Sequence, residues 1–420
     1  MTSTVIYLDH HATTPCAPQV VDAMLPYFTD TFANAASAHG PGAQALEAVE
    51  RARASIARLV SCESSEIVFT SGATEADNLA LIGAVEAAQK RLFGADAAQT
   101  GIGTLRGSGS LRGHLITQVT EHKAVLDTCI ALEKRGLDVT YLPVDHGGRV
   151  DPEAVREALR PDTLLVSIMW ANNEIGTIQP IAEIGGIIRE HRSGGSSTLF
   201  HTDAAQALTF LDCDVDGHNV DLMSLSGHKA YGPKGVGALY VRRKRPRVRL
   251  EAQMHGGGHE KGRRSGTLDV PSIVGFGVAC DLVAEHRESD TERLASLRDH
   301  LLNTLKSEFP ELHVNGSLEH RLPNNLNLSL PDVYAQDVLE HLPTVALSSG
   351  SACTSASQDG SYVLAALPGS RELADQSLRF GLGRSTTAEQ LDEAVAALRK
   401  AVEVARSLPA RAEDVCEVAC

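Results

Sequence analysis

The stretch "DLMSLSGHKAYGPKGVGALYVR", residues 221–242, does most to predict the fold of this 420-residue chain. It contains two short, nearly continuous apolar runs, 221–226 and 236–242, which a glycine-rich turn separates. Runs of this kind are typical of strands that are buried on both faces of a sheet. Lys229 lies in the turn, where an apolar sheet disfavours its charged form. Such a lysine is suited to act as an amine nucleophile.

Similar apolar runs occur upstream of this stretch, and helical patterns separate several of them. The runs are at 66–70, 114–120, 138–144, 163–170 and 198–203. Strands that alternate with helices predict an α/β fold with a mostly parallel sheet. In such sheets, ligands bind at the carboxyl ends of the strands.

The pattern changes in the last third of the chain. A charged helix is predicted near 287–307, and the short strand patterns "ELHVNG", "NNLNLSL" and "SLRFGLG" follow it. This order is typical of a smaller α+β domain. We therefore expect a large domain at 17–285 and a small domain formed by 1–16 and 286–420. The stretch 94–113 is rich in Gly, Ser and Ala, and it predicts a flexible surface insertion.

Composition excludes several classes of function. The net charge of −15 argues against nucleic-acid binding, since phosphate contacts need a basic face. The N-terminus has no pattern of a secretory signal, and no apolar run approaches the roughly 20 residues of a membrane span. The eight cysteines are scattered without a C-x-x-C pair, which favours the cytoplasm. We expect no metal site, because Arg263 replaces the second histidine that "HExxH" would need.

Polar residues follow the predicted strands and suggest a binding site. Ala73 and Thr74 begin a helix directly after the first strand, where free N–H groups and a hydroxyl suit an anion. Asp203 ends an apolar strand, where an unpaired carboxylate is costly and a cationic ring nitrogen would be a good partner. With Lys229 as an amine for an aldehyde, these features together predict a pyridoxal phosphate site.

Motifs along most of the chain resemble one enzyme family. "YLDHHATTP", "EIVFTSGATEADNLAL", "TEHKAVLDTC", "VSIMWANNEIGTIQPI", "HTDAAQ" and "SSGSACTSAS" resemble the cysteine desulfurases, from about Tyr7 to about Leu398. These enzymes belong to the class V branch of the aminotransferase-like pyridoxal phosphate enzymes. The form "SSGSACTSA" is similar to the iron–sulfur cluster assembly group. The resemblance implies the fold type I, aspartate aminotransferase-like architecture, with a mostly parallel seven-stranded sheet in the large domain.

The resemblance also implies a role for each matching residue. Lys229 would bind the cofactor's aldehyde, and His122 would stack on the ring and move protons. Cys353 would take the sulfur of L-cysteine as a persulfide and release L-alanine. The other implied roles belong to Asp203 (ring nitrogen), Asn173 and Gln206 (phenolic oxygen side), Ala73, Thr74, Ser226 and His228 (phosphate), Thr267 (phosphate of the partner subunit), and Asn34 and Arg379 (substrate carboxylate).

The role of Thr267 implies a homodimer, and the persulfide implies a sulfur acceptor. That acceptor would be an iron–sulfur scaffold protein or another protein, such as one that thiolates tRNA. Two alternatives use the same frame, namely a selenocysteine lyase and another class V aminotransferase. A third alternative is a non-catalytic sulfur or metal carrier that uses Cys353 and the tail thiols Cys416 and Cys420. One departure from the family is Ala35, which follows Asn34 where the family often has proline.

Overall fold

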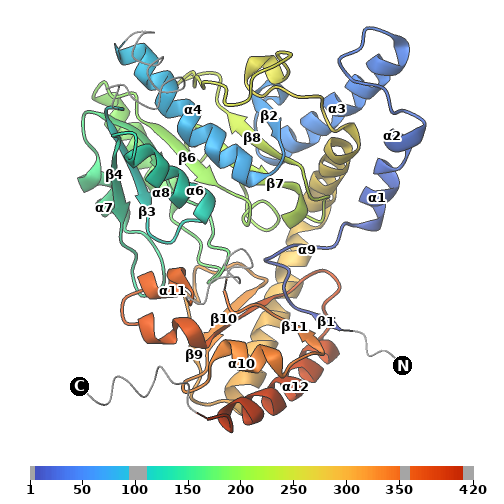
Figure 1. Ribbon diagram of the computed structural model, residues 1–420, viewed down its shortest axis with the longest axis vertical. Helices are drawn as coiled ribbons and strands as arrows, with labels where there is room; N and C mark the ends of the chain where they lie inside the picture. The colour runs from blue at the N-terminus through green and yellow to red at the C-terminus, as the bar shows by residue number, and fades with distance from the viewer. Residues whose placement is uncertain (1–4, 94–110, 351–359, 410–420) are drawn as a thin grey trace.

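The computed structural model describes residues 5–93, 111–350 and 360–409 (Figure 1). Within these residues the centre is a seven-stranded sheet in the order β2-β8-β7-β6-β5-β3-β4. β8 is antiparallel to β2 and β7, and the other neighbouring strands are parallel, so the predicted mostly parallel sheet is confirmed. The strands are β2 (Ile67–Thr70), β3 (His114–Gln118), β4 (Asp138–Leu142), β5 (Thr163–Ser167), β6 (Leu199–Asp203), β7 (Leu222–Ser226) and β8 (Gly237–Val241).

Helices cover this sheet and a second, smaller core, and they build much of the remaining described chain. None of the described helices is long and apolar enough to cross a membrane. The helices are α1 (Pro18–Met24), α2 (Pro26–Thr29), α3 (Gly40–Leu59), α4 (Ala73–Phe93), α6 (Lys123–Glu133), α7 (Pro152–Ala158), α8 (Ile181–Ser193), α9 (Val270–Glu308), α10 (Ala335–Glu340), α11 (Tyr362–Ala366) and α12 (Ala388–Arg406).

The sheet is buried on both faces because its strands are apolar at consecutive positions. Successive strand residues point to opposite faces. Val68 and Leu239 pack with α4 and α6 on one face. Phe69 and Tyr240 pack with α3, α8 and α9 on the other face. Every residue of β2, β3, β5, β7 and β8 is buried, which explains why these strands appear in the sequence as nearly continuous apolar runs.

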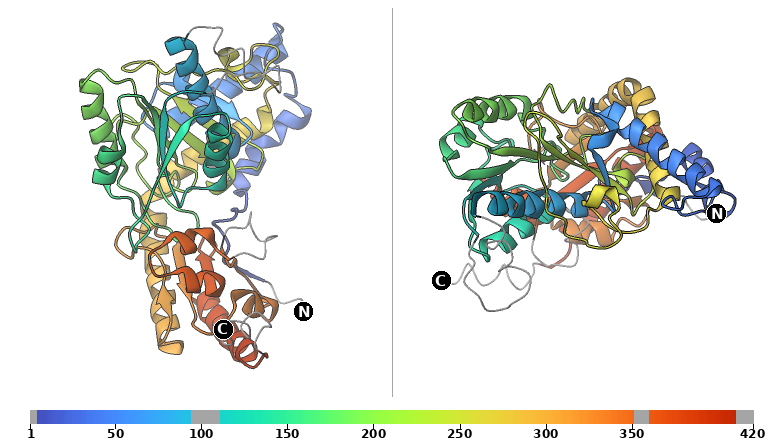
Figure 2. Two further views of the ribbon diagram at one scale, coloured as in Figure 1. Left: turned by 60° about the vertical axis from the view of Figure 1, so that its left-hand side comes forward. Right: turned by 90° about the horizontal axis from the view of Figure 1, so that it is seen from above.

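A second core lies at the other end of the molecule (Figure 2). It contains a three-stranded antiparallel sheet in the order β12-β10-β9, covered by α10, α12 and the C-terminal part of α9. β1 brings the N-terminal segment here by pairing in parallel with β11. These strands are β1 (Ile6–Tyr7), β9 (His313–Val314), β10 (Asn325–Ser329), β11 (Val345–Ala346) and β12 (Ser377–Gly381).

α9 connects the two cores as one continuous helix of 39 residues. The sequence predicted only the charged part of this helix, near 287–307. Its first half contains buried residues such as Phe276 and Cys280. It therefore lacks the polar face that would have indicated in the sequence a helix beginning at Val270. The expected division between residues 285 and 286 therefore falls inside a helix, and the two domains with those bounds stay a prediction.

Candidate active site

A cavity of about 540 Å³ lies at the carboxyl ends of β2, β6 and β7. This is where the parallel sheet was expected to bind a ligand. The cavity brings together most of the residues that the sequence singled out. Those that line it are Ala73, Thr74, His122, Asn173, Asp203, Gln206, Ser226, His228, Lys229 and Arg379.

Lys229 is held at the cavity by the N-terminal segment of the chain. It ends a short 3₁₀ turn that directly follows β7. Its Nζ donates hydrogen bonds to the backbone carbonyls of His11 and Ala12. Thr14 fixes this segment to the same turn, since both its N–H and its hydroxyl donate to the carbonyl of His228. These contacts position the amine at the cavity.

Asp203 is a buried carboxyl group at the end of β6, and only 6% of the residue is exposed. Burial raises its pKa, whereas nearby His122 and Lys229 and the hydrogen bond from the N–H of Ala205 act in the opposite direction. A buried carboxylate is stable only beside a positive or hydrogen-bonding partner. The cavity that Asp203 lines has room for such a partner, and a protonated ring nitrogen would satisfy this requirement.

The N-terminus of α4 forms the anion-binding end of the cavity. The helix begins at Ala73, as predicted, and its 21 residues direct their dipole toward this end. Ser226, Lys234 and His228 line the cavity with it. Burial, followed by the charges of Lys229 and Lys234, lowers the pKa of His228 to about 4. At neutral pH the histidine is therefore uncharged, and it binds an anion as a neutral hydrogen-bonding group.

His122 caps the N-terminus of α6 and faces the cavity. Its Nδ1 accepts a hydrogen bond of 3.1 Å from the N–H of Ala124. In the neutral imidazole one ring nitrogen is an acceptor and the other carries the hydrogen. The cap therefore places the exchangeable proton of His122 on Nε2.

Arg379 reaches the cavity from β12 and is only 1% exposed. One guanidinium nitrogen binds Oδ1 of Asp9 at 2.7 Å, and another donates to the carbonyl of Asn173 at 3.1 Å. A buried guanidinium held in this way is suited to bind a carboxylate.

Two further residues of the site were not predicted from the sequence. Asp9 pairs with Arg379, and His11 lines the cavity beside Gln206, with its Nδ1 3.0 Å from Oε1 of that residue. Burial lowers the pKa of His11 to about 3, so its ring is neutral. The available signal was the polar run in "YLDHHATTP", directly after an apolar stretch at the N-terminus.

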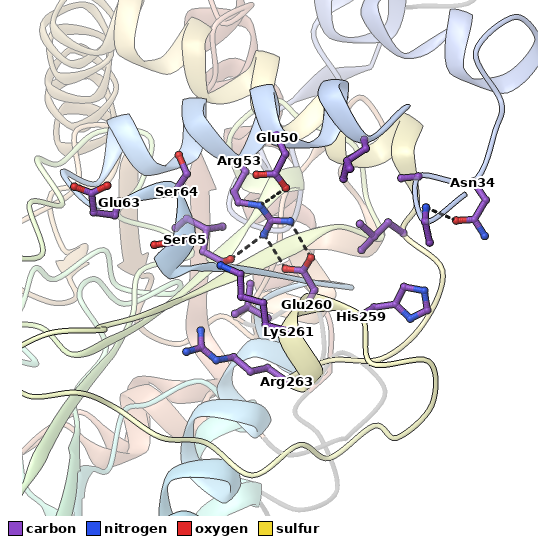
Figure 3. Close-up of a pocket in the computed structure, with 16 residues that line it drawn as sticks. Asn34, Glu50, Arg53, Glu63, Ser64, Ser65, His259, Glu260, Lys261 and Arg263 are labelled. Atoms are coloured by element: carbon purple, nitrogen blue, oxygen red, sulfur yellow. Dashed lines mark hydrogen bonds and ion pairs between the residues drawn. The ribbon is translucent and has the colours of Figure 1, made fainter. Parts of the chain in front are cut away.

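Two of the predicted residues that the structure describes, Thr267 and Asn34, do not line this cavity. Cys353 lies outside the described residues, as do Cys416 and Cys420. Thr267 is exposed and does not line the cavity of its own chain. Asn34 is exposed and lines a different pocket, where its Oδ1 accepts the N–H of Ala36 (Figure 3).

The described residues that flank 351–359 are anchored beside the cavity. Ser361 donates a hydrogen bond of 2.5 Å to Oε2 of Glu174, the neighbour of Asn173 in the chain. A Cβ added to Gly350 would lie 3.4 Å from the same carboxylate oxygen. Both ends of the segment that contains Cys353 therefore meet at Glu174.

The sequence of this chain is similar to those of known proteins. The family model described as aminotransferase class V matches residues 6–93 and 94–394. A protein named cysteine desulfurase IscS from Anaeromyxobacter dehalogenans (strain 2CP-C) is 52% identical over 391 residues, covering 93% of this chain and 90% of that protein. One of the same name from Methylococcus capsulatus (strain ATCC 33009 / NCIMB 11132 / Bath) is 50% identical over 404 residues, covering 96% and 94%.

Solved structures agree with these relatives. A NifS-like protein superposes with a TM-score of 0.84 at 32% identity, covering 96% of this chain and 100% of that chain. A structure described as SspA in complex with cysteine has a TM-score of 0.74 at 38% identity, covering 90% and 98%.

Proposed function

This chain belongs to the class V aminotransferase family and to its cysteine desulfurase group, and from this membership we propose that it converts L-cysteine to L-alanine. The sulfur atom passes to Cys353 as a persulfide. The observation that carries the proposal is the cavity that brings Lys229, Asp203 and His122 together with the buried Arg379.

Pyridoxal phosphate, the cofactor of this family, fits the residues of the cavity. Lys229 offers an amine for the aldehyde, and Asp203 offers a buried carboxylate that needs a cationic partner. The N-terminus of α4 with Lys234 suits the phosphate. When bound, the cofactor supplies an electron sink for the carbon atoms of the substrate.

The protein's own residues orient the substrate and handle its protons. Arg379 binds the substrate carboxylate, while Asp9 and the carbonyl of Asn173 fix the plane of the guanidinium. His122 carries its proton on Nε2, and this nitrogen exchanges the proton with substrate bound in the cavity. The neutral rings of His11 and His228 add no competing positive charge.

Cys353 accepts the sulfur atom. Its thiolate attacks the sulfur of bound L-cysteine, so an S–S bond forms and the C–S bond breaks. The electron pair of that bond stays with the carbon, which takes a proton to complete L-alanine. Only three positions separate Cys353 from Gly350, which limits the distance between their Cα atoms to about 11 Å. The position of Gly350 close to Glu174 therefore supports the delivery of this thiol to the cavity.

We also propose a homodimer, in which Thr267 and Asn34 serve the cavity of the other subunit. Both residues are exposed and lie away from the cavity of their own chain. Leu25, Phe28 and Phe32 expose 56%, 59% and 74% of their surface nearby in the sequence. A contiguous patch of such side chains marks an interaction site, and these three lie within one short segment of the chain.

The persulfide then needs an acceptor. We propose an iron–sulfur scaffold protein as the acceptor, or another protein that takes sulfur from a persulfide. We also propose the cytoplasm as the location, because the described cysteines 16, 62, 129, 213 and 280 are free thiols, as in reducing compartments.

The variant Cys353→Ser tests the proposal. We expect it to retain the bound cofactor and its absorption band but to form no L-alanine from L-cysteine, because the thiolate that accepts sulfur is missing. The measurements are the absorption spectrum, alanine release and the mass gain of one sulfur atom at Cys353 in the wild type. Full turnover by the variant would exclude the role of this thiol.

The same assay decides among the alternatives. Near-exclusive action on selenocysteine would identify a selenocysteine lyase, and transfer of the amino group to a keto acid would identify an aminotransferase. A colourless protein would favour a sulfur or metal carrier. Among the described residues, no group of three or more potential ligands could hold a metal ion.

A further inference from the structure

A second pocket, of about 530 Å³, contains an ion pair that no step of the proposed reaction uses (Figure 3). Arg53 lies on α3, and Glu260 lies in the glycine-rich loop 255–267. Two guanidinium nitrogens of Arg53 bind the two carboxylate oxygens of Glu260, each at 2.8 Å. The side chains are only 10% and 4% exposed, so this bidentate pair is largely buried.

The pair also completes the free edge of the central sheet. β2 is the edge strand, and an edge strand leaves backbone groups unpaired. Oε2 of Glu260 accepts the N–H of Phe69 at 2.9 Å, and Arg53 donates to the carbonyl of Ile67 at 2.8 Å. The guanidinium also lies 4.5 Å above the ring of Phe69. The loop is thus attached to the strand that leads into the anion-binding end of the cavity.

The backbone preferences of the loop residues do not by themselves favour the conformation that the loop adopts. Glu260 and Lys261 have φ values of +48° and +58°, which side chains other than glycine rarely adopt. A residue held in this region is strained and keeps its conformation only where the surrounding structure imposes it. Arg53 is the contact that holds both oxygens of Glu260, so we attribute the loop's shape to this pair.

The loop leads directly to a residue of the proposed dimeric site. Arg264 binds both carboxylate oxygens of Glu75, in the first turn of α4, at 2.8 and 3.2 Å. Thr267 is exposed three positions further on. Asn34, the other predicted residue that lies outside the cavity, lines the same pocket as the ion pair. The segment that carries Asn34 and the loop that leads to Thr267 therefore border the same pocket as Arg53 and Glu260.

We propose that Arg53 and Glu260 are positioning residues for the active site of the partner subunit. The ion pair fixes loop 255–267 against β2, so that Thr267 is presented to the cofactor phosphate bound in the other chain. This inference rests on the proposed homodimer and deepens it. It predicts that damage to the pair in one chain weakens cofactor binding in the other chain.

The test compares cofactor release from Glu260→Gln, Asp221→Asn and wild-type enzymes. Asp221 is a matched control, because its carboxylate also binds largely buried arginines, Arg192 and Arg242, and accepts a strand N–H, from Phe200, but lines neither pocket. We expect Glu260→Gln to release the cofactor roughly tenfold faster than the wild type, as the loss of a charge-assisted contact predicts. Asp221→Asn should release it at the wild-type rate.

Mixed dimers then show in which chain the pair acts. When a Glu260→Gln chain pairs with a Lys229→Ala chain, the only intact lysine lies in the chain with the altered loop, and the partner supplies an intact loop. We expect this mixed dimer to release the cofactor from Lys229 at the wild-type rate. Fast release from this mixed dimer, or slow release from the Glu260→Gln homodimer, would overturn the inference.

A milder variant covers the case in which Glu260→Gln does not fold. Arg53→Lys keeps the charge but cannot bind both carboxylate oxygens, so an intermediate release rate is expected. A wild-type rate in this variant would contradict the inference. A wild-type enzyme that forms no alanine would instead refute the proposed function. If the wild type is active but the mixed dimers do not recover slow cofactor release, only the role of the ion pair is refuted.

Discussion

At the residue scale, Asp203 is one of three buried carboxyl groups whose charges influence one another. Asp77, on α4, lies 3.6 Å from Nε2 of the buried His201, and Glu121 precedes His122. Burial and the charge of Asp203 raise the pKa of Asp77 well above its ordinary value, and they raise that of Glu121 to about 8. Glu121 therefore holds a proton at neutral pH, and the raised pKa of Asp77 favours its protonated form in the same way. Burial raises the pKa of Asp203 as well, but His122 and Lys229 oppose that shift, as a cationic ring nitrogen in the cavity would.

The raised pKa of Glu121 predicts a pH-dependent stability. Between about pH 4.5 and 8 the folded protein keeps a proton on Glu121 that the unfolded chain has lost. The free energy of unfolding therefore falls as pH rises through this window, on the order of 2–4 kcal/mol in total. Glu121→Gln has no such proton to lose, so its stability relative to the wild type should increase with pH. Urea unfolding of both proteins at pH 5, 6.5 and 8 measures this, and parallel pH curves would contradict it.

At the scale of elements, the approach of β8 to the β2–α4 turn shapes the anion-binding end. A Cβ at Gly237 would lie 2.5 Å from the carbonyl oxygen of Leu225 and 2.6 Å from Cα of Gly72, so glycine is needed there. The turn at Gly72 can then begin α4 directly at the cavity. The same close approach pairs β2 with β8 along the edge of the sheet.

Gly237→Ala should weaken cofactor binding, because the added methyl group pushes the turn away from β8. Overpacking of this kind costs about 1–3 kcal/mol. Gly186→Ala in α8 is the control, since its added Cβ meets nothing within 4 Å, and helical alanine is favourable. Cofactor titration of the two variants measures the difference. Equal affinities would show that the close approach does not shape the site.

The sequence predicted the elements of the large sheet better than those elsewhere. All seven of its strands were expected, and five of them, β2, β3, β5, β7 and β8, are buried at every residue and so leave nearly continuous apolar runs. The start of α9 was missed, because its first half is buried without a regular polar face. Lys229 and Asp203 could be found because each follows such a run. Asp77 and Glu121 could not, because their burial depends on how the helices pack against the sheet.

At the scale of the whole molecule, the cavity depends on segments that are far apart in the chain. The ion pair between Asp9 and Arg379 joins residues 370 positions apart, and β1 and β12 bring them together. No local pattern predicts such a contact, although both residues lie in motifs that resemble the family. The roles that we propose for Thr267 and Asn34 in a homodimer extend this dependence to a second copy of the chain.

The central claim is that Lys229 binds the aldehyde of pyridoxal phosphate, and borohydride reduction of the purified protein tests it most directly. Reduction fixes the cofactor to the amine that carries it, and peptide mass measurement locates the adduct. Lys234 lines the same cavity and serves as the internal comparison. The account predicts one cofactor adduct per chain, on Lys229. An adduct on Lys234 instead, or none at all, would contradict it.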